Sequence, residues 1–226
     1  QAPKENRSFS TIYGTCSADP DGNYWNNGME IRRLGTSPDI YYAVNPGREN
    51  HPIRFVSAFD ADAYAVWFSA REGRTYRLPT EQEWEKAAAW DPTISKHWAY
   101  GFQSDSISCS DANWSGGAAC PGAVTQVGQY NGTNGTNDAR SFYGCYDMTG
   151  NVWEWTSSET SVSGCNPTLR RVARGAAYDV SWNPYYGYAS LTTWARCMRY
   201  GDYYCWNCFE AGQRYGSIGF RLALDP

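Results

Sequence analysis

Charged residues are scarce in this 226-residue chain. They make up only 19% of it, and the net charge is -4 with a pI near 5.2. Such a protein repels a phosphate backbone, which argues against nucleic acid as a partner. No apolar run approaches the roughly 18 residues of a transmembrane helix, so we expect no membrane span. No stretch is rich enough in Pro, Gly or Ser to be a linker, and we expect one domain over residues 1–226.

Aromatic residues and cysteines are, by contrast, abundant. The chain holds 11 Trp, 18 Tyr and eight Cys. An even number of cysteines together with little Lys favours an oxidising compartment, so we expect disulfides and a secreted or surface-exposed protein. Eight cysteines allow 105 pairings. The sequence alone does not choose among them, although Cys109 with Cys120 closes a short loop.

Local patterns predict two helices and several short strands. The first helix is expected over 57–70, with Ala58, Ala61, Ala65 and Phe68 on one side, Tyr64 and Val66 near it, and a sheet beneath. The second starts at Thr80, where Glu83 can complete a capping box. Residues 91–144 are expected to be mostly loop. Strands are expected at 28–33, 40–44, 152–156, 171–174 and 218–224.

Four blocks in the second half of the chain carry a family resemblance. They read YRLPTEQEWE from Tyr76, YDMTGNVWEWT from Tyr146, RVARG from Arg171 and IGFRL from Ile218. In this order they resemble the formylglycine-generating enzyme (sulfatase-modifying factor) family. The match is good over 51–224 and poor over 1–50. The resemblance implies an α+β, C-type-lectin-like fold, loop-rich, with two helices and short mixed sheets.

The residues that catalytic members of this family use are replaced here. Those members follow an Arg-x-Gly-Gly start with a Ser and two cysteines, and the two cysteines bind copper(I). At the matching positions this chain has Ala177, Val180 and Tyr185. A soft metal ion needs thiolates, which neither Val nor Tyr supplies, so copper is not expected and we predict that the chain is not an enzyme.

Calcium, in contrast, is implied by the resemblance. Asp147, Gly150, Val152 and Glu154 match the ligands of one family site, the acids through their carboxylates and the other two through backbone carbonyls. Oxygen ligation of this kind suits a hard cation. Asn113 and Trp114 match part of a second, weaker site that lacks its acidic residue. The alternative is a purely structural role, in which Asp147 is a turn residue and Glu154 is a surface acid in an ion pair.

Tyrosines gather between the last two blocks, in residues 178–215, which we call the Tyr-rich segment. Clustered Tyr with Asp, Asn and Ser forms a rigid surface that stacks and hydrogen-bonds, which suits binding of a protein or a glycan. An aromatic core is the alternative. The predicted ligand-binding residues are Tyr178, Asp179, Ser181, Asn183, Tyr185, Tyr186, Tyr188, Tyr200, Asp202, Tyr203, Tyr204, Asn207 and Tyr215.

The place of this segment resembles the variable region of proteins diversified by retroelements, which use the same fold. Adenine-directed variation in those systems cannot produce Trp, Met, Gln or Glu. The resemblance therefore implies a fixed scaffold at Trp182, Trp194, Met198, Trp206, Glu210 and Gln213.

The sequence thus predicts a non-catalytic ligand-binding domain at a cell or phage surface. One alternative is a copper-dependent oxidase or oxygenase of the same family that uses Cys197, Cys205 or Cys208. Another is a structural component of a surface layer or adhesive fibre. The Cys205–Cys208 spacing also fits half of a zinc or redox site, but structural disulfides are favoured because the other half is missing.

Overall fold

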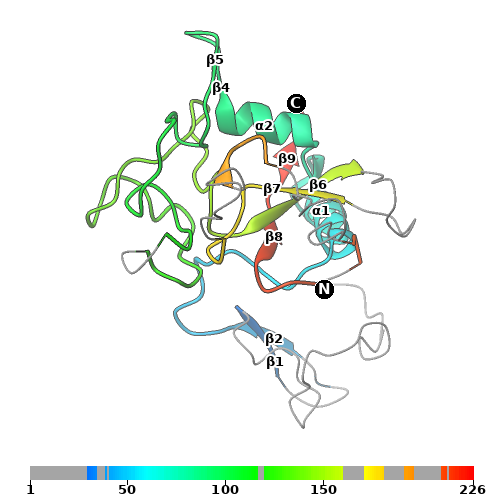
Figure 1. Ribbon diagram of the computed structural model, residues 1–226. Helices are drawn as coiled ribbons and strands as arrows, with labels where there is room; N and C mark the ends of the chain where they lie inside the picture. The colour runs from blue at the N-terminus through cyan, green and yellow to red at the C-terminus, as the bar shows by residue number, and fades with distance from the viewer. Residues whose placement is uncertain are drawn as a thin grey trace, which may run out of the picture.

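The computed structural model of the protein describes residues 30–34, 39, 41–116, 120–159, 171–180, 191–195, 210–212 and 214–226. The elements are β1 (Ile31–Leu34), β2 (Tyr41–Val44), α1 (Ala58–Glu72), β3 (Tyr76–Arg77), α2 (Glu81–Ala89), β4 (Trp90–Asp91), β5 (Lys96–His97), β6 (Trp153–Glu159), β7 (Arg171–Arg174), β8 (Ile218–Phe220) and β9 (Ala223–Leu224). Short strands and two helices are grouped together in these residues, and the long loops between α2 and β6 extend to one side of them (Figure 1). This is the predicted α+β, loop-rich architecture.

A three-stranded mixed sheet of order β7-β6-β8 lies at the centre. Strand β6 pairs antiparallel with β7 and parallel with β8. Successive side chains of a strand point to opposite faces of its sheet, so neighbouring residues of β6 contact different parts of the molecule. Trp153 and Trp155 face a core that includes Ala58 and Ala61 of α1, whereas Glu154 faces Trp84 of α2. The two helices therefore pack against β6 from opposite faces.

Both helices begin with capping boxes. Ser57 caps α1 with Asp60, and Thr80 caps α2 with Glu83, as predicted for the second helix. Helix α1 runs two residues beyond its predicted end and stops at Gly73, whose left-handed backbone suits glycine. The expectation for one side chain was wrong: Val66 is not near the buried face but 71% exposed.

The predicted strand 218–224 is two strands that belong to different sheets. Strand β8 joins the central sheet and β9 pairs with β3. The break falls at Arg221, whose side chain reaches Glu154 on β6. The other expectations are close to the observed bounds, although β6 starts at Trp153 and extends to Glu159, and a short β4–β5 hairpin opens the long loop region.

A disulfide and a close backbone contact hold the loops between α2 and β6. The bond between Cys109 and Cys120 confirms the pairing that loop length favoured. Gly150 has a φ of +81°, and a Cβ there would lie 2.2 Å from the carbonyl oxygen of Asn113. Only glycine allows this approach, so the loop carrying Asn113 is fixed against the start of β6.

Candidate functional site

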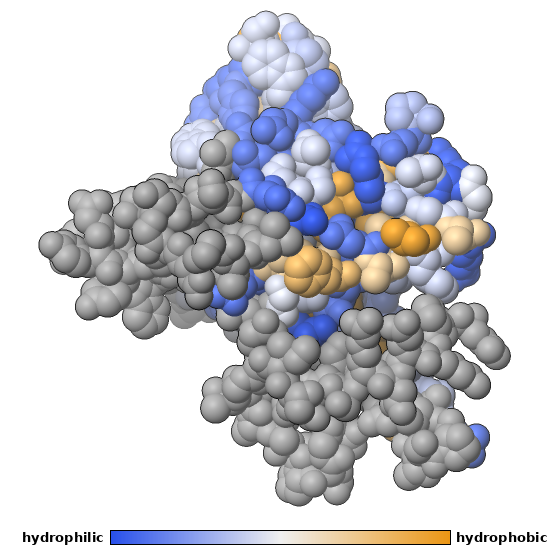
Figure 2. Space-filling model, turned by 90° about the vertical axis from the view of Figure 1, so that its right-hand side faces the viewer, coloured by the Kyte–Doolittle hydropathy of each residue, from blue (hydrophilic) through white to orange (hydrophobic). Residues whose placement is uncertain are grey.

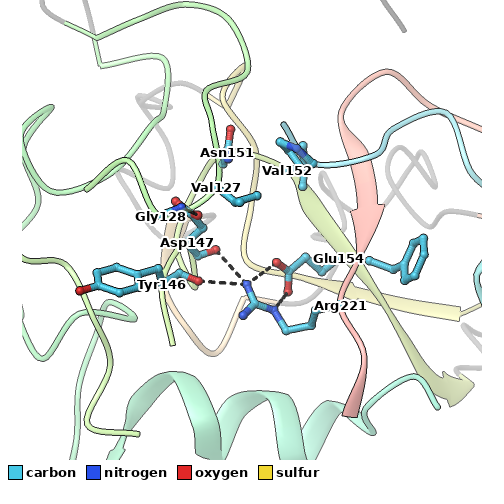
Figure 3. A pocket seen from close by; sticks show the side chains of 10 residues that line it. Val127, Gly128, Tyr146, Asp147, Asn151, Val152, Glu154 and Arg221 are labelled. Atoms are coloured by element: carbon cyan, nitrogen blue, oxygen red, sulfur yellow. Dashed lines mark hydrogen bonds and ion pairs between the residues drawn. The ribbon is translucent and has the colours of Figure 1, made fainter. Parts of the chain in front are cut away.

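Arg221 lies at the centre of a hollow of about 390 Å³ beside the central sheet (Figure 3). Its Nε and Nη2 donate to the two carboxylate oxygens of Glu154, each at 2.5 Å. Its Nη2 also donates to the carbonyl oxygen of Tyr146 at 3.1 Å. Trp84 donates to the same carboxylate from the other side, at 2.6 Å. We call this the Arg221 hollow. It is lined by Pro52, Val127, Gly128, Tyr146, Asp147, Asn151, Val152, Glu154, Phe220 and Arg221.

Electrostatics explain why Arg221 stays charged there. Burial alone would lower the pKa of Arg221, but the adjacent carboxylate of Glu154 raises it above its ordinary value. Asp147 differs. Burial raises the pKa of its carboxyl group, although the backbone N–H of Gly128, at 2.6 Å, and the charge of Arg221 act in the opposite direction. The hollow thus contains a tight ion pair and a second, desolvated carboxyl group.

Three of the four residues in the main calcium prediction come together around this hollow, and Gly150 does not line it. Both carboxylate oxygens of Glu154 accept hydrogen bonds from Arg221, and the carboxylate of Asp147 accepts one from the backbone N–H of Gly128. The guanidinium of Arg221 therefore occupies one acceptor position on each oxygen of Glu154 and would compete with a calcium ion for this carboxylate. The described residues contain no group of three or more His, Cys, Asp or Glu side chains suited to a metal ion. Calcium binding here remains a prediction.

The second predicted site consists of two buried residues, Asn113 and Trp114. Asn113 is buried, and its amide nitrogen donates to the carbonyl oxygen of Ala123 at 2.9 Å and to the side chain of Asn151 at 3.2 Å. Its Oδ1 is also buried, and no donor among the described residues reaches it. A buried oxygen of this kind suits a cation or an ordered water. Trp114 is buried next to it.

The described ends of the Tyr-rich segment are attached to the core. Tyr178 is half-buried and its N–H donates to the carbonyl oxygen of Asn151, while Asp179 is exposed. Val180 is half-buried and packs against the main core. Tyr215 is half-buried, and its carbonyl oxygen accepts from Phe55.

The chain also returns to the core inside the segment. Leu191 and Ala211 are fully buried, and Thr193 bonds through its backbone N–H to Ala99. Trp194, implied to be fixed scaffold, is exposed and lies near the His97 ring. Glu210, also implied to be fixed scaffold, is half-buried. The other predictions fall outside the described residues: Ser181, Trp182, Asn183, Tyr185, Tyr186, Tyr188, Cys197, Met198, Tyr200, Asp202, Tyr203, Tyr204, Cys205, Trp206, Asn207, Cys208 and Gln213.

Sequence reasoning missed the two arginines that organise these regions. Arg174 is fully buried on β7; it bonds to Glu85 of α2 and to the carbonyl oxygen of Thr193. Arg221 organises the hollow. Arg174 is the last residue of β7 and Arg221 directly follows β8, and an arginine next to buried strand residues is the signal that could have revealed a buried ion pair.

Comparisons with known proteins place the chain in a family. Residues 12–226 match the Sulfatase-modifying factor enzyme 1-like domain, a wider span than the motif-bearing 51–224. The chain is 39% identical to hercynine oxygenase of Mycolicibacterium smegmatis over 135 residues, 60% of this chain but 26% of that protein. It is 32% identical to formylglycine-generating enzyme of Thermomonospora curvata over 184 residues, 79% of this chain and 57% of the enzyme.

Non-catalytic relatives also match. The chain is 34% identical to the bovine (Bos taurus) inactive C-alpha-formylglycine-generating enzyme 2 over 128 residues, 56% of this chain and 38% of that protein. In fold it resembles Treponema denticola variable protein 1, with a TM-score of 0.57 at 18% identity, covering 81% of this chain and 74% of that one. The chain thus spans about a quarter of the hercynine oxygenases it matches, and it belongs to the Sulfatase-modifying factor enzyme 1-like domain family.

Proposed function

We propose that this chain is a non-catalytic, calcium-stabilised binding domain that uses the Tyr-rich segment to recognise a protein or a glycan. The observation that carries the proposal is the environment of Val180. The motif resemblance matches Val180 to a copper-binding cysteine of catalytic members, and the Val180 side chain packs against the core. An aliphatic side chain in a packed core provides neither a ligand for copper(I) nor a thiol for oxidation.

The attachment of the Tyr-rich segment supports a binding role. Buried residues at 177, 191 and 211 hold the chain at intervals between β7 and β8. Binding residues are commonly found on loops that a rigid scaffold positions. The likeness in fold to a variable protein agrees with this, and inactive members of the family show that it includes proteins without the oxidase activity.

Two features agree with display outside the cell or on a phage particle. The Cys109–Cys120 disulfide suits an oxidising compartment. In the described part of the chain, no helix is both long and apolar enough to cross a membrane.

Alanine variants of the tyrosines test the proposal directly. On an exposed binding face, Tyr185→Ala with Tyr203→Ala should leave the melting temperature almost unchanged, because surface substitutions cost little. Tyr100→Ala is the matched control: Tyr100 is buried, and its loss should cost about 3–5 kcal/mol of the free energy of unfolding. Equal destabilisation by both sets would assign the segment to the core and refute the binding face.

Sequencing siblings of this gene from one source tests the variable character. Differences should concentrate in residues 178–215 and spare Trp194 and Glu210. Variation spread evenly along the chain would contradict this part of the proposal.

An oxygenase is the second candidate, and the observation in its favour is the 39% identity to hercynine oxygenase. Its metal ligands would include Cys197, Cys205 or Cys208. Oxygen uptake by the purified protein, loaded with copper(I) or iron(II) and given hercynine or a thiol peptide, separates the two functions. Uptake that depends on metal and substrate would overturn the binding proposal.

A further inference from the structure

Helix α1 exposes an apolar stripe on the side away from the core. The stripe consists of Phe59, Ala63, Val66 and Ala70, whose spacing places them on one face of the helix. Phe59 is 49% and Val66 71% exposed, and both alanines are exposed. Because the opposite face already packs against the core, α1 is apolar on two sides.

The surface view agrees with this description. Figure 2 shows hydrophobic side chains forming a band across the face that lies on the right of Figure 1, where α1 is found. Charged side chains border the band. Contiguous apolar surface with a polar rim is typical of an interface between proteins.

We propose that this stripe binds a second copy of the chain, with the two α1 helices packed antiparallel about a two-fold axis. The order of residue sizes carries the inference. In this arrangement Phe59 of one copy faces Ala70 of the other, and Ala63 faces Val66. Every large side chain contacts a small one, and the two-fold axis repeats each of these contacts, so the stripe is complementary to itself. Such self-complementarity is what a two-fold interface requires.

Charges along the edge of the stripe agree with the antiparallel direction. Asp60 lies at the N-terminal end of α1 and Arg71 at the C-terminal end, on the same flank. Arg71 is exposed and stacks on Trp67, with its guanidinium 5.5 Å from the ring centre. Antiparallel copies bring Arg71 to the same edge as Asp60 of the other copy, which also pairs with Arg214, whereas parallel copies would place this flank on opposite edges of the contact. The dipoles of antiparallel helices also oppose each other favourably.

The size of the contact sets the expected affinity. A helix of 15 residues is about 22 Å long. A contact of this length is smaller than the roughly 800 Å² per partner of a standard interface. We therefore expect a reversible dimer with a dissociation constant on the order of micromolar.

Sedimentation equilibrium over about 1–500 µM protein tests the proposal, a range chosen to bracket that affinity. The wild-type chain should shift from monomer to dimer and should form nothing larger. Val66→Glu should raise the dissociation constant at least about tenfold, because it places a charge in the apolar contact. Ile94→Glu is the matched control. Ile94 is 58% exposed on the β4–β5 turn, away from α1, and its replacement should leave dimerisation unchanged. Unchanged melting temperatures would show that all variants are folded.

A mixing experiment tests the register. Val66→Glu and Ala63→Lys chains should each dimerise poorly alone but form a mixed dimer, since Glu at 66 then faces Lys at 63. Val66→Glu mixed with Ala70→Lys should not pair, because position 70 faces Phe59. A wild-type chain that stays monomeric throughout the range, normal dimerisation of Val66→Glu, or equal pairing in both mixtures would each overturn the proposal.

Discussion

Removing the carboxylate of Glu154 should destabilise the protein more than removing the whole ion pair. Glu154 is 5% exposed and accepts from Arg221 and Trp84. In Glu154→Leu, the indole N–H loses its acceptor and the guanidinium loses its counter-charge, keeping only its bond to the carbonyl oxygen of Tyr146. Breaking a buried pair costs about 3–5 kcal/mol. The Arg221 side chain is 28% exposed and water can reach it, so we expect about 2–4 kcal/mol here.

The double variant Glu154→Leu with Arg221→Met should recover much of this loss. It removes both charges and fills the space with apolar atoms, a change that is often close to neutral. We expect it to lie within about 1–2 kcal/mol of wild type, well below the sum of the losses in the two single variants. Urea unfolding of the four proteins of the cycle, with equal m-values, measures these losses. Additive effects of the two changes would refute the role assigned to the pair.

Comparing the wild type with the double variant also identifies the residues that bind calcium. Binding to the native state alone raises stability by mass action, so chelation should lower the melting temperature of wild type. If calcium binds through Glu154, chelation should not affect the double variant. If it binds at Asn113 instead, chelation should lower both melting temperatures equally. A melting temperature that chelation leaves unchanged in wild type would contradict calcium binding at either place.

Two further predictions concern α2 and the loops. Hydrogen bonds from Arg77 and Thr80 lower the pKa of Glu83 to about 2, so its stabilising effect is complete above pH 4.5 and lost as the pH falls toward 2. Glu83→Gln should lower the free energy of unfolding by about 0.5 kcal/mol at pH 7, the low end for an exposed cap, and thermal melts should show that difference vanishing in acid. A difference that persists at pH 2 would contradict this. Replacing Cys109 and Cys120 by Ser should cost about 2–3 kcal/mol in urea unfolding, because the closed loop is short; no loss would indicate that the bond does not form.

Local signals in the sequence were the most reliable guide to the fold. The Thr80 capping box and the end of β7 were predicted correctly, because each depends on a few adjacent residues. The break between β8 and β9 was missed because it depends on Arg221 reaching Glu154, 67 positions away in the chain. No periodicity in one strand reveals such a contact.

The candidate sites show the same limit. Motif resemblance placed Asp147 and Glu154 in one region, and the structure brings them to one hollow. The resemblance gave no indication that Arg221 holds the carboxylate of Glu154, since a family motif names residues but not their partners. The exposure of Val66 was also missed, because a helix that is apolar on two sides has no single face that the pattern can assign to the core.

The pairing of β7 and β8 with the same strand also bears on how freely the Tyr-rich segment can change. Arg174 and Ile218 flank β6 on its two sides, so the segment begins and ends at fixed points. The entropy of closing a loop grows only with the logarithm of its length, about 0.6 kcal/mol for each doubling. The entropic cost of lengthening the chain between these two points is therefore small. Substitutions at Leu191 or Ala211 would instead act on the packed core, because both side chains are fully buried.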